Sequence, residues 1–216
     1  REETPEAIRL SVPIIKDIIR AYRIPILEVA GYEADDVIGT LATKAGKQGI
    51  KTYMMTPDKD YGQLVTENVF MYRPKYGDKE FEVMGVEEVK AKFDIESPSQ
   101  VIDMLGLMGD TADNIPGCPG VGEKTAQKLI SQFGSIENLL ENTDQLKGAI
   151  KTKVESNIEK IKFSKFLATI KIDVPVELNL DELKRETPDE ARLREIFEEL
   201  EFRTLIERIF KTEKKV

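Results

Sequence analysis

The first part of the chain alternates short apolar runs with a helical repeat of apolar positions. Residues 26–29, 51–56 and 68–72 are short apolar runs of the kind that forms buried strands. Between the first two runs, apolar residues recur at helical spacing over residues 33–48, where Gly46 and Gly49 are expected to end the helix. Strand, helix and strand in this order predict a parallel sheet, with ligands bound beyond the carboxyl ends of the strands.

A further helix is predicted ahead of this sheet, at residues 4–22, from a stripe of isoleucines. Thr4 is expected to cap this helix, and Pro5 is expected at its first position. Pro13 lies inside the pattern and is expected to kink or split the helix, because proline lacks a backbone N–H.

Helical patterns dominate the chain after the short apolar run at residues 81–83. We predict helices at residues 86–93, 97–108, 122–133, 135–141, 149–163, 163–171 and 189–210. The change of pattern falls near residues 84–96. We therefore predict two domains, an α/β core at residues 1–94 and an all-helical domain at residues 95–216.

Composition restricts the chemistry that this chain can perform. It has no histidine and a single cysteine, Cys118, which excludes zinc cages, histidine bases and serine–histidine triads within it. A metal would sit among oxygen ligands, which favours magnesium, manganese or calcium. No apolar run approaches the roughly 20 residues of a membrane helix, so no membrane partner is expected. The lone cysteine fits a reducing cytoplasm.

Acidic residues gather at three places, each at an end of an expected element: Glu33, Asp35 and Asp36; Asp58 and Asp60; Asp110 and Asp113. Each group alone has an ordinary explanation, because acids complement the dipole at a helix start and often cap turns. Seven carboxylates brought together would repel one another without cations. A shared metal site is the simplest arrangement that accounts for all three groups.

Carboxylates from several elements suit one chemistry in particular. Two hard cations roughly 3.5–4 Å apart clamp the attacking and leaving oxygens of a phosphodiester, and no histidine is needed. The net charge of −8 carries little weight against a nucleic-acid substrate, because acids and lysines cluster at different places.

A glycine-rich turn at residues 114–126 is the second specific feature. Its Pro-Gly, Pro-Gly and Val-Gly pairs predict a tight hairpin, and Gly122 to Thr125 open the next helix, which carries Lys124 and Lys128. Unobstructed N–H groups at a helix start form a phosphate cradle that grips a nucleic-acid backbone without reading its sequence. An ordinary connection between two helices is the alternative.

Four stretches together resemble the 5′-nuclease domains of bacterial DNA polymerase I, within the wider flap endonuclease family. They are Gly-Tyr-Glu-Ala-Asp-Asp, Thr-Pro-Asp-Lys-Asp-Tyr-Gly-Gln-Leu, Leu-Met-Gly-Asp-Thr-Ala-Asp-Asn-Ile-Pro-Gly and Gly-Val-Gly-Glu-Lys-Thr-Ala. They occur in the family's order, and the resemblance extends from Arg1 to about Phe210.

The resemblance implies an α/β fold with a PIN-like parallel-sheet core, followed by a helix–three-turn–helix (SAM-like) module that holds duplex DNA. It implies that two Mg²⁺ or Mn²⁺ ions are held by catalytic acids of the core and by a second pair: Glu33, Asp35, Asp36, Asp58 and Asp60, then Asp110 and Asp113. It implies DNA contacts from Lys59, from the hairpin and from the helical arch: Arg1, Lys59, Gly117, Gly120, Gly122, Lys124, Thr125 and Lys128. A K⁺ ion held by backbone carbonyls is expected at the hairpin.

The family pattern begins before Arg1, with a strand bearing a metal-binding aspartate, a second such aspartate and an arch lysine. The chain is therefore expected to be a piece of a longer protein, with a polymerase following Val216, and to bind DNA yet cleave it weakly by itself. We expect a monomer in the bacterial cytoplasm, associated with the nucleoid, acting on 5′-flapped, nicked or primer-containing duplexes in primer removal and DNA repair.

Two other functions compete with this structure-selective 5′-nuclease. A non-catalytic DNA-binding piece would bind duplexes in a salt-sensitive way without turnover. A phosphohydrolase of the aspartyl-phosphate type is suggested by Asp58 and Asp60 at a strand end, but Gly62 stands where that chemistry needs a threonine or valine.

Overall fold

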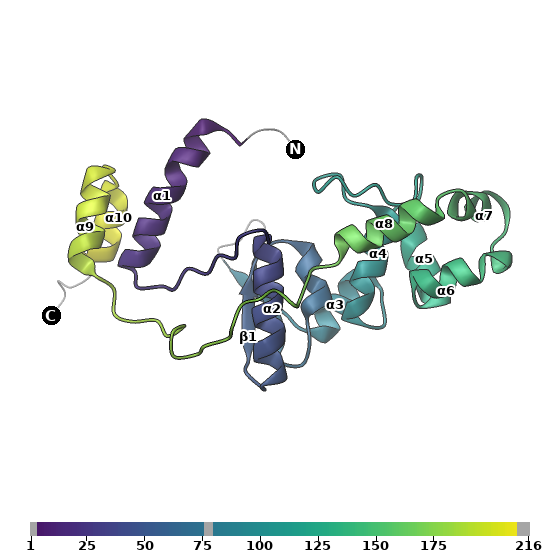
Figure 1. The fold of residues 1–216 in the computed structure, drawn as a ribbon, viewed down its shortest axis with the longest axis horizontal. Helices are drawn as coiled ribbons and strands as arrows, with labels where there is room; N and C mark the ends of the chain where they lie inside the picture. Colours follow the sequence, from purple (N-terminus) through teal and green to yellow (C-terminus); the bar gives the residue numbers. More distant parts are fainter. Residues whose placement is uncertain (1–3, 76–79, 211–216) are drawn as a thin grey trace. The chain divides into compact units, whose positions relative to one another are not determined.

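The computed structural model describes residues 4–75 and 80–210, and these residues form two compact units (Figure 1). Residues 29–178 make up the larger unit, and residues 1–28 together with 179–216 make up the smaller one. The domain boundary that the sequence predicts, at residues 94 and 95, lies inside the larger unit. No helix among the described residues is long and apolar enough to span a membrane.

A three-stranded sheet forms one part of the larger unit. Strand β1 (Thr52–Met55) pairs in parallel with β2 (Val69–Pro74), and β2 pairs in antiparallel fashion with β3 (Phe81–Met84). Helix α2 (Ala34–Lys47) contacts β1 and β2 (Figure 1). The helix predicted at residues 33–48 and the strands predicted at residues 51–56 and 68–72 are confirmed, and these two strands pair in parallel. The strand predicted at residues 26–29 is wrong: this run is irregular, and among the described residues no strand offers its backbone a partner.

Local chemistry explains where α2 begins and ends. The backbone turns at Gly31, whose φ of 84° lies in the left-handed region, and Glu33 then caps the helix. Asp36 completes a capping box by accepting a hydrogen bond from the Glu33 N–H. Gly49, with φ of 75°, follows the last turn. Two of the three acids predicted at the start of this helix, Glu33 and Asp36, are therefore held in its cap.

Helices make up the rest of the larger unit: α3 (Val86–Phe93), α4 (Val101–Met108), α5 (Glu123–Phe133), α6 (Ile136–Glu141), α7 (Gly148–Glu155) and α8 (Ile158–Ala168). The short 3-10 helices η2 (Pro98–Gln100) and η3 (Thr143–Gln145) lie between these helices, whereas η1 (Lys59–Leu64) lies between β1 and β2. The break predicted at residue 163 is wrong, because the chain leaves the helix at Asn157 instead, whose φ of −129° is not helical. This break allows Val154 and Ile161 to be fully buried in one core.

Helix α4 lies at the centre of this core. Val101, Met104, Leu105 and Leu107 are each 0% exposed, and α4 packs on α8 and α5. One acid is buried with them. Asp103 accepts hydrogen bonds from the Lys165 ammonium (2.6 Å) and from the backbone N–H of Ile136 (3.0 Å), which ties α4 to α8 and to the start of α6.

The smaller unit contains α1 (Glu6–Ala21), α9 (Glu190–Glu199) and α10 (Arg203–Phe210) around a core of Ala21, Leu193, Ile196 and Phe197. Pro5, rather than the predicted Thr4, precedes the first helical residue. Pro13 does not split α1, because its fixed φ is compatible with a helix, in which it leaves one carbonyl without an N–H donor. The single helix predicted at residues 189–210 is divided near Glu201, whose φ is 56°.

Candidate functional site

The turn after β1 places two acids beyond the carboxyl end of a parallel strand. Asp58 caps η1, and its Oδ1 accepts a hydrogen bond from the Asp60 N–H at 3.0 Å. The Asp58 N–H in turn donates to the Thr56 hydroxyl at 3.1 Å. These bonds fix the turn so that Asp60 faces inward, where it is only 8% exposed. The site thus lies where the strand and helix pattern predicts one.

A second tight turn follows α4 and carries the other pair of acids. Gly109 ends the helix with φ of 73°, and Asp110 and Ile115 exchange backbone hydrogen bonds of 2.9 and 2.7 Å. The Asp110 Oδ1 also accepts from the Ala112 N–H, which closes the turn from inside. Asp113 lies at the exposed tip of this turn.

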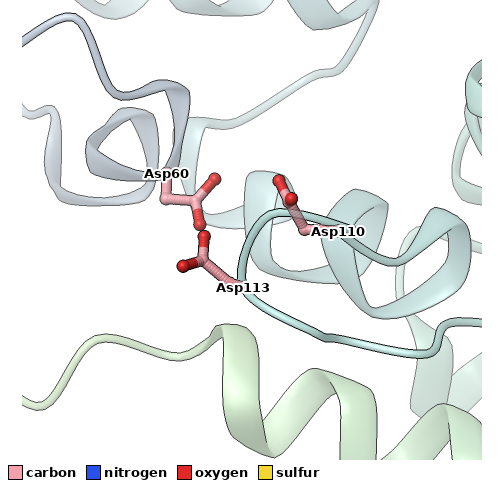
Figure 2. A group of neighbouring side chains, drawn as sticks. All are labelled: Asp60, Asp110 and Asp113. Atoms are coloured by element: carbon pink, nitrogen blue, oxygen red, sulfur yellow. The ribbon is translucent and has the colours of Figure 1, made fainter. Parts of the chain in front are cut away.

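The two turns meet. Carboxylate oxygens of Asp60, Asp110 and Asp113 all lie within 4.8 Å of one another. Figure 2 shows the Asp60 and Asp113 carboxylates facing each other, with Asp110 beside them. Asp60 is 50 or more positions away from Asp110 and Asp113 along the chain, so the fold itself brings the two turns together.

This convergence is electrostatically unfavourable without a counter-charge. Burial, followed by the charge of Asp58, raises the pKa of Asp60 to about 7, although Lys59 acts in the opposite direction. The Lys59 ammonium bonds to the Asp110 carboxylate, and this bond holds the pKa of Asp110 below its ordinary value. One oxygen of Asp60, Oδ1, accepts no hydrogen bond although it is buried. Lys59 therefore balances part of the negative charge of the cluster, and Asp60 retains an unsatisfied acceptor.

The donor set fits a hard divalent cation. Three carboxylates offer oxygen ligands of the kind that Mg²⁺ and Mn²⁺ prefer, and the buried, unbonded oxygen of Asp60 is the atom that gains most from a cation. A cation there would also relieve the repulsion that raises the pKa of Asp60. Asp60, Asp110 and Asp113 are thus the residues best placed to hold one.

The other four predicted ligands lie outside this group of three. Asp35 accepts a hydrogen bond from the Tyr61 hydroxyl at 2.8 Å, and Asp36 accepts from the Lys171 N–H at 3.0 Å. Asp58 holds the Asp60 N–H, and Glu33 caps α2. All four acids lie in the same compact unit as the cluster, in α2 or at the start of η1.

The glycine hairpin after the Asp113 turn is built by close backbone packing. Gly117 is buried with φ of 60°, and its N–H donates to the hydroxyl of Ser164 on α8 at 2.9 Å. A Cβ on Gly117 would lie 2.6 Å from the carbonyl carbon of Met108. Gly120, in contrast, is exposed, and its carbonyl accepts a hydrogen bond from the Lys153 ammonium at 3.0 Å. Of the predicted DNA contacts, Gly117 is therefore inside the hairpin and Gly120 is at its surface.

The start of α5 carries the remaining predicted DNA contacts. Gly122 caps the helix, is exposed, and leaves open space where a side chain would stand. Lys124 and Lys128 line one groove along α5, and Thr125 and Lys128 line another. Lys59 lies away from these grooves, at the acid cluster. Arg1 lies outside the described residues.

Sequence reasoning missed several side chains that hold this site together. Gln63 donates from Nε2 to the carbonyls of Asp60 (3.0 Å) and Ala168 (2.9 Å), so it joins the turn of Asp60 to the end of α8. Ser164 and Lys153 hold the hairpin from α8 and α7. Gln63 is part of the motif Thr-Pro-Asp-Lys-Asp-Tyr-Gly-Gln-Leu, and this position could have identified it as a residue of the site. Ser164 and Lys153 stand in ordinary helical patterns, which gave no such signal.

The fold is that of solved flap endonucleases. A zinc-bound 5′-exonuclease of T5 aligns with a TM-score of 0.63 over 91% of this chain and 72% of its own, at 20% identity. A flap endonuclease of bacteriophage T5, solved with DNA and metal ions, aligns with the same score over 93% of this chain and 73% of its own, at 19% identity. The catalytic core of Rad2 in complex with a DNA substrate aligns with a TM-score of 0.60 over 92% of this chain and 64% of its own, at 16% identity. The predicted fold class is confirmed.

Sequence comparison adds the family. The model of the N-terminal resolvase-like domain of 5′-3′ exonucleases matches residues 1–94, and that of their C-terminal SAM fold matches residues 96–191. A 5′-3′ exonuclease of Aquifex aeolicus is 37% identical over 98% of this chain and 70% of its own length. This chain belongs to the 5′-3′ exonuclease family, as the four motifs predict.

DNA polymerase I relatives are matched as well, with 40% identity in Bacillus caldotenax and 42% in Bacillus subtilis, in each case over 97% of this chain. The chain spans 24% of the length of either polymerase. Its similarity is therefore to one part of these longer proteins.

Proposed function

We propose that this chain hydrolyses phosphodiesters at the 5′ ends or flaps of DNA duplexes, as the 5′-nuclease part of a DNA polymerase I. One observation carries the proposal: Asp60, Asp110 and Asp113 converge from two separate turns at the carboxyl edge of a parallel strand. Family membership, together with solved relatives whose printed descriptions include DNA and metal ions, supports it.

The acids and the lysines have separate roles in this proposal. Asp60, Asp110 and Asp113 hold Mg²⁺ or Mn²⁺ together with the neighbouring acids Glu33, Asp35, Asp36 and Asp58. When bound, such ions supply Lewis-acid stabilisation of the charge that develops on the phosphate. Lys59, 38% exposed beside Asp110, is close enough to the cluster to contact a phosphate of the bound strand. Asp60 is buried, so its carboxylate has little contact with bulk water.

The start of α5 holds the adjacent duplex. Gly122 exposes the first N–H groups of the helix. Lys124 and Lys128 line one solvent-open groove, and Thr125 and Lys128 line another. Contacts of this kind position a duplex without reading its bases. A K⁺ ion at the hairpin belongs to the proposal too, in competition with Lys153 for the carbonyl of Gly120. The polymerase region of the parent protein is the proposed intramolecular partner, in a monomer of the bacterial cytoplasm.

Metal-dependent cleavage is the direct test. We expect a 5′-flapped duplex to be cut in Mg²⁺ or Mn²⁺ and to remain intact in EDTA. Asp58→Asn should lower the rate by at least about 10–100-fold, because Asp58 is a proposed ligand that also holds the backbone of Asp60, and groups that only orient ligands already contribute that much. The measurement is single-turnover cleavage of a labelled flap on a gel.

Asp144→Asn serves as the matched control, because Asp144 is exposed in η3 and far along the chain from the acid cluster. Cleavage that persists in EDTA, or an Asp58→Asn rate equal to that of the control, would contradict the assignment. Duplex binding without turnover in Mn²⁺ would favour a DNA-binding role instead.

Duplex binding should depend on the lysines of α5. Lys124→Ala and Lys128→Ala are each expected to weaken duplex binding at all sequences and to reduce the slope of log K against log salt by about 1, since each removes one phosphate contact. Fluorescence anisotropy at several KCl concentrations gives both quantities. Lys47→Ala, an exposed lysine at the end of α2, is the control and should leave the slope unchanged. Equal slopes for all three variants would remove α5 from the DNA interface.

A further inference from the structure

Tyr61 connects the acid cluster to the acidic start of α2. It follows Asp60 directly in η1, and its side chain is only 3% exposed in the core of the larger unit. From there its hydroxyl reaches across to α2 and donates a hydrogen bond to the Asp35 Oδ1 at 2.8 Å. One side chain thus joins two segments that are 26 residues apart in the sequence.

The surroundings of this hydroxyl keep it a donor. Burial, then the hydrogen bond to Asp35, and then the charges of Asp35, Asp58 and Asp36 raise the pKa of the phenol far above its ordinary value. The phenol is therefore neutral near pH 7. A neutral donor fixes a carboxylate oxygen without adding a charge that would compete with a cation.

A hydrogen-bond partner matters for the orientation of the Asp35 side chain, because packing alone does not hold it in one rotamer. It lies in the first turn of α2, and its side chain is partly exposed, so without a bond it is free to occupy several rotamers. The bond from Tyr61 occupies Oδ1 and leaves Oδ2 available to a ligand. Outer groups that orient a metal-binding carboxylate in this way contribute substantially to metal affinity.

We propose that Tyr61 is a positioning residue, which holds the Asp35 carboxylate in place as a ligand of the divalent cation. This inference rests on the proposed function, because it takes Asp35 as a ligand of the cation. The competing explanation is that a buried tyrosine requires some partner for its hydroxyl, and Asp35 is merely the nearest acceptor.

Tyr61→Phe removes only the hydroxyl and keeps the ring in the core. We expect this variant to bind Mn²⁺ about 10-fold more weakly, measured in the full chain by isothermal titration calorimetry or by loss of the free-ion signal in electron paramagnetic resonance. At saturating Mn²⁺ its flap cleavage should return to within about threefold of the original rate, because the site is assembled once the ion is bound. Tyr72→Phe is the matched control: that ring stacks on Phe81 in the sheet, and its binding curve should not move.

A double-mutant cycle separates positioning from stability. In an Asp35→Asn background, Tyr61→Phe should cause no additional loss of Mn²⁺ affinity if it acts through Asp35. Equal affinities for Tyr61→Phe and Tyr72→Phe would overturn the proposal, as would the same loss in both backgrounds. A thermal melt that shows Tyr61→Phe already unfolded at the assay temperature would overturn it too, because the weaker binding would then reflect lost stability. The binding readout needs no cleavage. A chain that binds Mn²⁺ without cutting DNA would therefore refute the proposed function and leave the role of Tyr61 intact.

Discussion

Asp60→Asn is expected to abolish flap cleavage and, at the same time, to make the metal-free protein more stable. The loss of cleavage should be at least about 100-fold, because groups that only orient metal ligands already contribute 10–100-fold. The gain in stability follows from the structure without a cation. Asp60 is buried beside Asp58, Asp110 and Asp113, and its Oδ1 accepts no hydrogen bond, so neutral asparagine removes repulsion that folding would otherwise have to overcome. Cleavage assays and thermal unfolding in EDTA measure the two effects.

The sign of the pH dependence gives this prediction a second check. The pKa of Asp60 is about 7 in the folded protein, above its value of about 3.9 in an unfolded chain, so the folded state binds more protons between these values. The free energy of unfolding of the original chain in EDTA should therefore fall as the pH rises from about 4 to 7, and Asp60→Asn should escape this loss. Because the pKa rises from about 3.9 to about 7, the difference between the two proteins should reach roughly 4 kcal/mol above pH 7 and become small near pH 4.

Addition of Mn²⁺ should reverse the order of the two stabilities, because a cation bound by the original carboxylates stabilises the folded state. Asp173→Asn, at an exposed carboxylate in the segment after α8, is the control and should change neither cleavage nor the pH profile. An Asp60→Asn variant that is less stable than the original chain in EDTA at pH 7 would show that the cluster is not under electrostatic strain.

The sequence allowed the α/β part to be predicted because its signals are local. The apolar run of β1, the capping box of Glu33 and Asp36, and the glycine after α2 each act within a few residues. The strand predicted at residues 26–29 failed because a strand exists only through a partner, which no local pattern supplies. The helix breaks at Asn157 and Glu201 were missed for a related reason: each is a backbone departure that tertiary packing sets, and neither has a glycine or proline to mark it.

The candidate site also has a part that the sequence predicts and a part that it does not. Asp60, Asp110 and Asp113 could be proposed as a group from their residue types, their positions at element ends and the resemblance. The bonds that place them could not, because they cross between elements that are distant in the sequence. Examples are Gln63 to Ala168 and Tyr61 to Asp35. Whether Glu33, Asp35, Asp36 and Asp58 share a cation with the cluster stays a prediction.

The glycines illustrate a further limit. The Pro-Gly pairs predicted a tight hairpin, and the family resemblance implied DNA contacts from Gly117, Gly120 and Gly122 alike. In the structure Gly122 has open space around it, whereas Gly117 packs against the backbone of Met108 and Gly109. The need for glycine at these two positions has different causes, exposure to a ligand in one case and close backbone approach in the other, and only the fold distinguishes them.

Gly117→Ala should therefore disrupt both the hairpin and the turn that carries Asp110 and Asp113. Its new Cβ would lie 2.6 Å from the Met108 carbonyl carbon and 2.8 Å from the Gly109 Cα, and these are backbone atoms that cannot rotate away. The φ of 60° adds strain of its own. We expect a loss of about 3 kcal/mol or more in the free energy of unfolding, measured by urea titration, from overpacking plus backbone strain. Because Gly109 immediately precedes Asp110, the surviving folded protein should also bind Mn²⁺ and duplex DNA more weakly.

Gly134→Ala separates the two causes of that loss. Gly134 also has a positive φ, of 77°, but a Cβ there would meet nothing within 4 Å, so this variant carries the backbone strain without the collision. Gly134→Ala should lose only about 1 kcal/mol in the free energy of unfolding. It should bind Mn²⁺ and duplex DNA normally, because Gly134 lies at the end of α5 and not in the turn of Asp110 and Asp113. If the two variants lost the same stability, the close contact between Gly117 and Gly109 would contribute nothing.

If Gly117→Ala kept full Mn²⁺ affinity, the hairpin and the Asp110 turn would be independent parts. The expected difference would instead make them a single rigid body, in which the position of the duplex is fixed relative to the carboxylates that act on it.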